Sequence, residues 1–308
     1  MMKRTVAFCG VLSLTMSVAT THAAELKKVG IAVNNIGDPY YVALARGAEQ
    51  KLKTIAPAAS VTTVSSGYDI TKQINQIENF ISAGVSMIIV TPSDYQALAP
   101  ELARAKAQGI AVVGADTGSN GLVAGVQTDN VAAGQMACAE LARRLGDKGN
   151  VVVVKGAPIS VITDRVNGCL GELKKHPGIK VLSSDQSGGG TRDGGLSVMQ
   201  NLLSRFGNID GAFVVAEEMA IGARIATVQA GHNRILITTV DGSPAIQQEM
   251  KGNDGQIVAT AAQNPRGIGE QAAEIGVALA AGKSISDPFR KLPPKLVTKE
   301  AISNYSGW

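Results

Sequence analysis

Short apolar runs rich in β-branched residues alternate along the chain with longer segments of helical periodicity. Such runs of four to eight residues are typical of strands that are buried on both faces. They predict ten strands, at Lys28–Val33, Ser60–Ser65, Met87–Val90, Ile110–Ala115, Leu122–Gln127, Val151–Lys155, Lys180–Ser184, Gly211–Val215, Ile235–Val240 and Ile257–Ala262. The helical segments lie between most of these strands, at Tyr40–Thr54, Ile70–Ala83, Tyr95–Gln108, Val131–Leu145, Arg165–Lys175, Leu196–Phe206, Glu218–Ala230, Ala245–Lys251 and Arg266–Ala281. The alternation predicts the α/β class, with parallel sheets built from right-handed crossovers.

Ten strands are too many for one small doubly wound sheet, so the pattern predicts two. A natural division falls at Thr128-Asp129-Asn130, where two rounds of the alternation separate. Near the other end, Lys291-Leu292-Pro293-Pro294 is typical of an extended linker, because the residue before a proline is biased away from the helix.

The first two dozen residues have the pattern of a secretory signal peptide. Lys3 and Arg4 give a positive start, and the mostly apolar run Val6–Val18 follows. Cleavage after Ala23 would leave small residues at both recognition positions. We therefore expect residues 1–23 to be removed and the protein to be exported to the periplasm.

The charge is nearly balanced, with 29 Lys and Arg against 25 Asp and Glu. Aromatic residues make up only 4% of the chain, and no basic stripe is present, so the pattern of a nucleic-acid-binding protein is absent. Cys138 and Cys169 follow the predicted signal peptide. Export permits a disulfide between them, but two free thiols are the alternative, because sequence does not give the distance between them.

Motifs of catalysis and of cofactor binding are missing. The sequence has no GxGxxG, GxxxxGK[ST], GxSxG or HExxH motif. Outside the signal peptide, two cysteines and the scattered His176 and His232 do not make a zinc-binding set. These observations predict a protein that is not an enzyme and that holds no cofactor and no metal.

Two adjacent tyrosines follow the first predicted strand. The turn Gly37-Asp38-Pro39 leads into a helix that opens with Tyr40 and Tyr41, and a proline suits the first turn of a helix. This places both rings at the carboxyl edge of a sheet, where open α/β sheets bind small ligands. A ligand with a flat apolar face, such as a sugar ring, would suit them, and packing in the core is the alternative.

Polar residues also follow several other predicted strands. Thr91, Asp116, Asp241 and Gln263 each stand at or just after a strand end. Singly, each is explained as a helix cap or a turn former. Together they offer carboxylate and amide groups that bind hydroxyls. Arg165 lies near a helix start, where the helix dipole disfavours a cation; its planar guanidinium suits sugar or carboxylate oxygens, and a salt bridge is the alternative.

The ordered set of these segments resembles the ribose-type periplasmic sugar-binding proteins of ABC transporters (periplasmic binding proteins of type I). The resemblance is carried by GDPYYVALARGAE, IIVTPSD, IAVVGADTG, TDNVAAG, DRVNG, VMQNLL, AEEMAIGA, TTVDGSP and AAQNP. It implies two doubly wound, Rossmann-like parallel-sheet lobes joined by a three-stranded hinge, with the ligand between them. The lobes would comprise residues 24–128 with 264–292, and residues 129–263 with 293–308.

The resemblance also assigns ligand-binding positions. Tyr40 and Tyr41 match the aromatic pair of the family, and its hydroxyl-binding positions are matched by Asp116, Arg165, Asp241 and Gln263. Thr91, Thr117 and Ala216 stand where ribose binders carry asparagine, arginine and asparagine, and Gly190 stands where they carry a ring-contacting phenylalanine.

These departures remove contacts from the second lobe. They favour a larger sugar, an amino sugar or a polyol over ribose bound in the usual way. Glu217 or Glu218 would then meet a ligand amine, or would merely favour the start of a helix, as acidic residues do.

The expected function is delivery of a sugar or polyol to an ABC importer, with the ligand enclosed by hinge closure. The implied partners are the ligand and a transporter permease, with a chemoreceptor as a further candidate, but no nucleic acid, and a monomer suits the role. A chemoreceptor ligand or quorum-signal (furanosyl-type) binding protein of the same fold is the alternative. A repressor of this fold would need an N-terminal helix-turn-helix, where this chain has a signal peptide.

Overall fold

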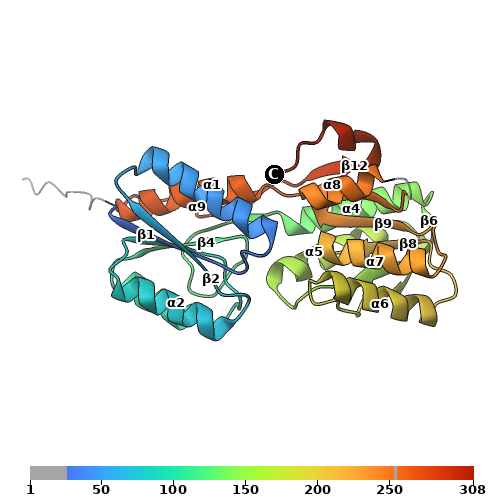
Figure 1. The fold of residues 1–308 in the computed structure, drawn as a ribbon, viewed down its shortest axis with the longest axis horizontal. Helices are drawn as coiled ribbons and strands as arrows, with labels where there is room; N and C mark the ends of the chain where they lie inside the picture. Colours follow the sequence, from blue (N-terminus) through green and yellow to red (C-terminus); the bar gives the residue numbers. More distant parts are fainter. Residues whose placement is uncertain (1–25, 253–254) are drawn as a thin grey trace, which may run out of the picture.

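The computed structural model describes residues 26–252 and 255–308. Two α/β lobes lie side by side, each built around a six-stranded sheet (Figure 1). The predicted α/β class with two sheets is therefore confirmed. The predicted signal peptide, with its cleavage site, lies outside the described residues.

The first sheet is entirely parallel, in the order β11-β5-β4-β3-β1-β2. Its strands are β1 (Lys28–Val33), β2 (Ser60–Ser65), β3 (Met87–Val90), β4 (Ala111–Ala115), β5 (Gly125–Thr128) and β11 (Phe289–Leu292). Alternate residues of one strand face opposite cores. Met87 and Ile89 of β3 pack with α1 (Pro39–Ile55) and α9 (Pro265–Ala280). Ile88 and Val90 pack with α2 (Ile70–Ser82) and α3 (Ala99–Ala107), so both faces of the sheet are buried.

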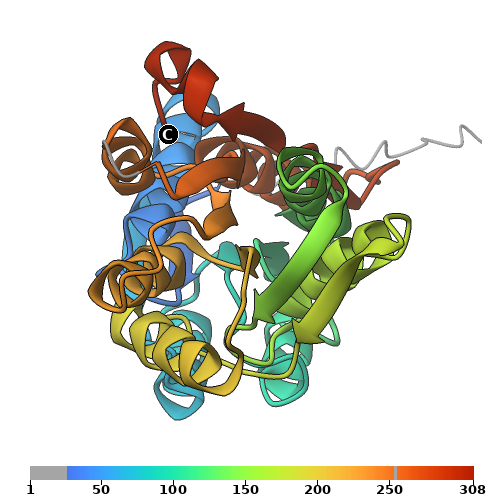
Figure 2. The ribbon, with the colours of Figure 1, turned by 90° about the vertical axis from the view of Figure 1, so that its right-hand side faces the viewer.

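The second sheet has the order β12-β10-β9-β8-β6-β7 and is parallel except at one edge. Its strands are β6 (Lys148–Val154), β7 (Gly178–Ser183), β8 (Gly211–Val214), β9 (Leu236–Asp241), β10 (Ile257–Ala262) and β12 (Lys295–Thr298), and β12 runs antiparallel to β10. Its helices are α4 (Asn130–Arg144), α5 (Ser160–Leu173), α6 (Arg192–Arg205), α7 (Glu217–Gln229), α8 (Pro244–Lys251) and the 3-10 helix η1 (Lys299–Asn304). Figure 2 shows β6 and β7 between the green α4–α5 pair and the yellow-to-orange α6–α7 pair.

The chain passes between the two sheets three times. After β5 ends at Thr128, α4 packs against β9 and β10 of the second sheet. After β10 ends at Ala262, α9 packs against β3, β4 and β5 of the first. The third passage joins β11 to β12 through Pro293 and Pro294, and the segment that follows η1 returns between the lobes (Figure 1).

Helices α4 and α5 pack with their backbones close together. A Cβ atom at Gly134 would collide with the backbone carbonyl of Arg165, and one at Gly168 would collide with that of Val131. Cys138 lies one turn after Gly134, and Cys169 directly follows Gly168. The two cysteines form a disulfide with their Cα atoms 5.1 Å apart. Of the two alternatives for these cysteines, a disulfide or two free thiols, the structure shows the disulfide. The close packing of α4 and α5 also fixes the backbone of Arg165. Within residues 26–252 and 255–308, no helix is long and apolar enough to cross a membrane.

Candidate ligand-binding site

The start of α1 brings Tyr40 and Tyr41 to the carboxyl edge of the first sheet. Asp38 caps the helix, its Oδ1 accepting a hydrogen bond of 2.9 Å from the backbone N–H of Tyr40. Both rings are buried in the core beneath α1 and α9, and they meet edge to face with their centroids 5.3 Å apart. Because the rings are packed in this way, their hydroxyl groups are the parts that enter the polar cluster described next.

Asp116 follows β4 directly and is the polar centre of the first lobe. The Tyr40 hydroxyl donates to its Oδ1 at 2.7 Å, and the Tyr41 hydroxyl lies 3.5 Å from its Oδ2. Burial raises the pKa of the Asp116 carboxyl to about 6, against the hydrogen bond from Tyr40 and the charge of Arg165. The carboxyl is therefore mostly ionised at neutral pH and accepts hydrogen bonds.

The second carboxylate, Asp241, stands at the end of β9 and is held by the side chains of Gln263 and Arg165. Gln263, just after β10, donates from Nε2 to its Oδ1 at 2.7 Å. Arg165 donates to the same oxygen from Nη1 at 3.2 Å. Arg165 also donates from Nη1 to the carbonyl of Val215 and from Nε to Oδ1 of Asn130, both at 2.8 Å. These three partners of Arg165 lie in the second lobe or at its first connection to the first lobe, so in this structure Arg165 forms the salt bridge that was the alternative to ligand binding.

The two carboxylates belong to one hydrogen-bonded cluster. The Tyr40 hydroxyl, bound to Asp116, lies 3.3 Å from Oε1 of Gln263, whose amide nitrogen binds Asp241. The cluster thus runs from the carboxyl end of β4 in the first sheet to the carboxyl end of β9 in the second. It joins Tyr40, Tyr41, Asp116, Arg165, Asp241 and Gln263, six of the nine residues that the sequence predicts as ligand-binding.

The other three residues predicted to bind the ligand lie outside this cluster. Oγ1 of Thr91 accepts the backbone N–H of Asn34 at 2.8 Å, and Thr117 donates to the carbonyl of Pro92 at 2.8 Å. Ala216 is the N-cap residue of α7 and packs against the core of the second lobe. At Gly190, a Cβ atom would meet nothing within 4 Å, so the space next to this backbone position is open.

Glu217 has a role that sequence reasoning missed. Its carboxylate accepts hydrogen bonds from the backbone N–H of Gly242, from that of Ser243 at 2.9 Å and from the Thr260 hydroxyl at 2.9 Å. Its own N–H donates to Oδ2 of Asp241 at 3.3 Å. Burial, and then the charge of Asp241, raise the pKa of the Glu217 carboxyl. Glu217 therefore holds the turn that carries Asp241, whose φ of 139° is unusual for a residue other than glycine.

Two aromatic residues near the cluster were also missed, because nothing in the sequence pattern links them to it. Trp308 donates from its indole nitrogen to the backbone carbonyl of Asp241 at 2.7 Å, and its ring meets that of Tyr40 edge to face, with centroids 5.7 Å apart. Tyr68, in the loop between β2 and α2, meets Tyr41 in the same way at 6.1 Å.

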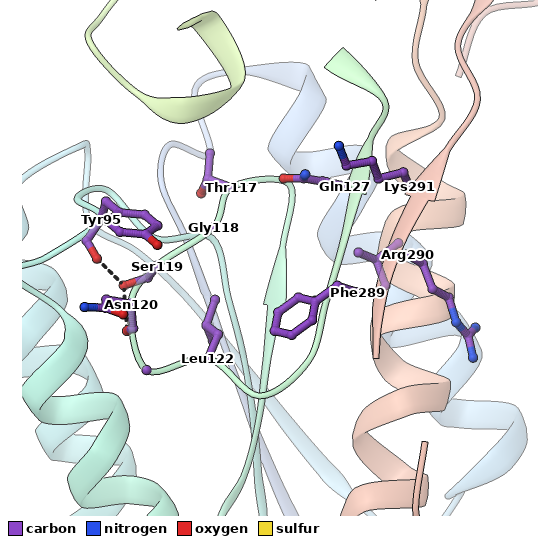
Figure 3. A pocket seen from close by; sticks show the side chains of 13 residues that line it. Tyr95, Thr117, Gly118, Ser119, Asn120, Leu122, Gln127, Phe289, Arg290 and Lys291 are labelled. Atoms are coloured by element: carbon purple, nitrogen blue, oxygen red, sulfur yellow. Dashed lines mark hydrogen bonds between the residues drawn. The ribbon is translucent and has the colours of Figure 1, made fainter. Parts of the chain in front are cut away.

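A separate cavity of about 280 Å³ lies at the edge of the first sheet, between the β4–β5 loop and β11. Figure 3 shows the rings of Tyr95 and Phe289 on opposite sides of Leu122, with Thr117 nearby. The carboxylates of Asp116 and Asp241 do not line it. The part of the chain that the structure describes contains no group of three or more His, Cys, Asp and Glu arranged to hold a metal ion.

The comparisons with known proteins agree on one family. The family described as "Periplasmic binding protein domain" matches residues 29–284. The chain is 32% identical to the xylitol-binding protein of Mycolicibacterium smegmatis, over 94% of this chain and 83% of the relative. It is 31% identical to the ribose import binding protein of Bacillus subtilis, over 88% of this chain and 87% of the relative. A periplasmic solute-binding protein of an ABC transporter from Actinobacillus succinogenes, solved with bound D-allose, has a similar structure, with a TM-score of 0.84 at 27% identity, covering 91% of this chain and all of that one.

Proposed function

The chain belongs to the periplasmic binding protein domain family, and we propose that it binds a sugar or sugar-like polyol in the periplasm and delivers it to an ABC importer. Its relatives include a xylitol-binding protein, a ribose import binding protein and an ABC transporter periplasmic solute-binding protein with bound D-allose. The observation that carries the proposal is the cluster that joins Asp116 of one lobe to Asp241 of the other. Two carboxylates at the carboxyl ends of strands in two sheets are placed as acceptors for the hydroxyls of one polyhydroxylated ligand.

Selectivity in this proposal comes from the hydrogen-bonding groups. A ligand hydroxyl donates to Asp116 or Asp241, while Arg165 and Gln263 donate to ligand oxygens. A compound that lacks one of these hydroxyls leaves a buried partner unpaired, which penalises its binding. The proposed ligand-binding set is Tyr40, Tyr41, Thr91, Asp116, Thr117, Arg165, Ala216, Asp241 and Gln263; of these, Thr91, Thr117 and Ala216 lie outside the hydrogen-bonded cluster in this structure.

Closure of the lobes completes the site. Hinge closure around a ligand is the motion known for periplasmic binding proteins, and the three passages between the sheets would serve as the hinge. Residues 24–128 with 264–292 then move against residues 129–263 with 293–308. The closed form would present both lobes to the permease, and a chemoreceptor would recognise the same form.

Other parts of the proposal concern the whole protein. We propose export with cleavage of the signal peptide near Ala23 and action as a monomer. The protein releases its ligand unchanged, so incubation with a bound sugar yields no product.

A thermal-shift screen tests the proposal. Pentoses, hexoses, amino sugars and polyols, including D-ribose, D-allose and xylitol, are added to the purified protein. A ligand that binds only the native state at 100 times its Kd stabilises it by about 2.7 kcal/mol. We expect at least one compound to raise the melting temperature of the unaltered protein and of the surface control Lys175→Ala. Asp241→Ala and Arg165→Ala should show no shift, and an unchanged shift in both would overturn the assignment of the site.

A further inference from the structure

Four aromatic side chains form a continuous row at the polar cluster. In order they are Tyr68, Tyr41, Tyr40 and Trp308, and each meets the next edge to face, with centroids 6.1, 5.3 and 5.7 Å apart. The two middle rings are packed in the core and are only 5% and 7% exposed. Tyr68 is 51% exposed, so at this end of the aromatic row a large ring surface remains open to a ligand.

The backbone of Tyr68 is held in a conformation that a tyrosine disfavours. Its φ is +65° and follows Gly67, whose φ is +68°. The N–H groups of both residues donate to the backbone carbonyl of Asn34, at 2.6 Å for Gly67 and 3.2 Å for Tyr68. Bulky residues are rare in this left-handed region, and such strained residues gather at functional sites. Glycine would satisfy the same turn without strain, so the turn alone does not explain a tyrosine here.

The same turn places Tyr68 beside the proposed ligand site. Asn34 follows β1 directly, and its side-chain amide donates to the Tyr41 hydroxyl at 3.4 Å. The pKa of Tyr68 is raised to about 12, first by burial and then by the charges of Asp38, Asp116 and Asp241. The ring is thus partly open to solvent and lies near carboxylates of both lobes.

We propose that Tyr68 is a specificity-determining residue of the site, whose exposed ring contacts the apolar C–H face of the bound sugar or polyol. This inference rests on the proposed function and extends it. Tyr41 meets the Tyr68 ring edge to face, and the hydroxyls of Tyr40 and Tyr41 are directed to Asp116. On the second lobe, Gly190 offers no ring, and open space surrounds the position of its missing Cβ. Tyr68 therefore supplies the broad aromatic contact, and it favours ligands with a continuous C–H face.

The test compares Tyr68→Gly, Tyr68→Ala and Tyr68→Phe with the unaltered protein. Tyr95→Ala is the matched control, since Tyr95 is 52% exposed on the same lobe and lines the separate cavity. Xylitol, D-ribose and D-allose are the probes, and calorimetric titration gives Kd for each one that binds. Melting temperatures are measured without ligand.

We expect Tyr68→Gly and Tyr68→Ala to weaken binding about tenfold, the size of a good aromatic contact. Tyr68→Phe and Tyr95→Ala should stay within about threefold of the unaltered protein, which is less than 1 kcal/mol. Without ligand, Tyr68→Gly should melt at the same or a higher temperature, because glycine relieves the strained φ.

If the unaltered protein binds a probe and Tyr68→Gly binds it with the same affinity, this inference is overturned, but the proposed function is not. A loss of affinity accompanied by a fall in the ligand-free melting temperature of Tyr68→Gly also overturns it, since Tyr68 would then be structural. If none of the three probes nor any other sugar or polyol binds the unaltered protein, the proposed function itself fails, and the role of Tyr68 fails with it.

Discussion

Replacing Arg165 by methionine tests the core of the site most sharply. Its side chain is 5% exposed and donates three hydrogen bonds, to Asn130, Val215 and Asp241. Methionine keeps most of the apolar stem but removes the charge and every donor. The carboxylate of Asp241 would then lose its cation, and breaking a buried ion pair on one side costs about 3–5 kcal/mol.

The structure places the expected loss at the lower end of that range. Asp241 keeps hydrogen bonds from Gln263 and from the backbone N–H of Glu217, and its side chain is still 20% exposed to water. We therefore expect Arg165→Met to lower the free energy of unfolding by about 3 kcal/mol. Urea denaturation followed by circular dichroism measures this loss.

A double-mutant cycle separates the ion pair from other effects. Asp241→Asn removes the charge that Arg165 neutralises, so the double variant should lose about 1–3 kcal/mol less than the sum of the two single losses. If the losses add to within about 0.5 kcal/mol, Arg165 and Asp241 do not interact, and the reasoning about this site is refuted.

Three further predictions concern the framework of the site. Gly134→Ala in α4 should lower the free energy of unfolding by about 1–3 kcal/mol, because the new methyl group meets the Arg165 backbone. Gly171→Ala in the partner helix α5, with open space around it, should raise the free energy of unfolding by about 0.5–1 kcal/mol. Equal effects of the two variants in urea denaturation would contradict this packing. Replacing Cys138 and Cys169, 31 residues apart, by serine should cost about 3–4 kcal/mol, and reductant should then no longer affect the melting temperature. In the folded protein the pKa of Asp116 is about 6, above its ordinary value. The protonated carboxyl therefore contributes fully to the free energy of unfolding below about pH 4, and this contribution is lost as the pH rises through 6. Between pH 4 and 7, the free energy of unfolding of Asp116→Asn should fall by about 2–3 kcal/mol less than that of the unaltered protein. Parallel pH curves for the two proteins would show that the pKa of this carboxyl is not raised.

Sequence patterns predicted the central strands because burial on both faces leaves a clear mark. Val151–Val154 and Met87–Val90 are continuous apolar runs, and both lie in strands, whereas Lys155, at the end of the predicted strand Val151–Lys155, lies outside β6. The edge strands β11 and β12 were missed, since they are four residues long and mix charged with apolar side chains. The strand predicted at Leu122–Gln127 starts at Gly125, and the chain before it forms turns in which Leu122 fills the space beside Gly114.

Part of the candidate site could be predicted from the sequence, because a single structural rule determines where those residues lie. Polar residues at the carboxyl ends of parallel strands meet at one edge of a sheet, and this rule located Asp116, Asp241 and Gln263. Distances between residues far apart in sequence follow no such rule. Trp308 reaches Asp241 only because the chain after Pro294 pairs with β10 and then turns back between the lobes. The three hydrogen bonds of Glu217 likewise depend on how α7 meets the turn after β9.

A crystal structure with a bound sugar or polyol, chosen from the thermal-shift screen, would show whether both carboxylates bind the ligand. We expect ligand hydroxyls to lie within hydrogen-bonding distance, about 3 Å, of the carboxylates of both Asp116 and Asp241, with the two lobes closed around the ligand. A ligand bound in the cavity between Tyr95 and Phe289, or held by one lobe without contact to either carboxylate, would contradict this expectation.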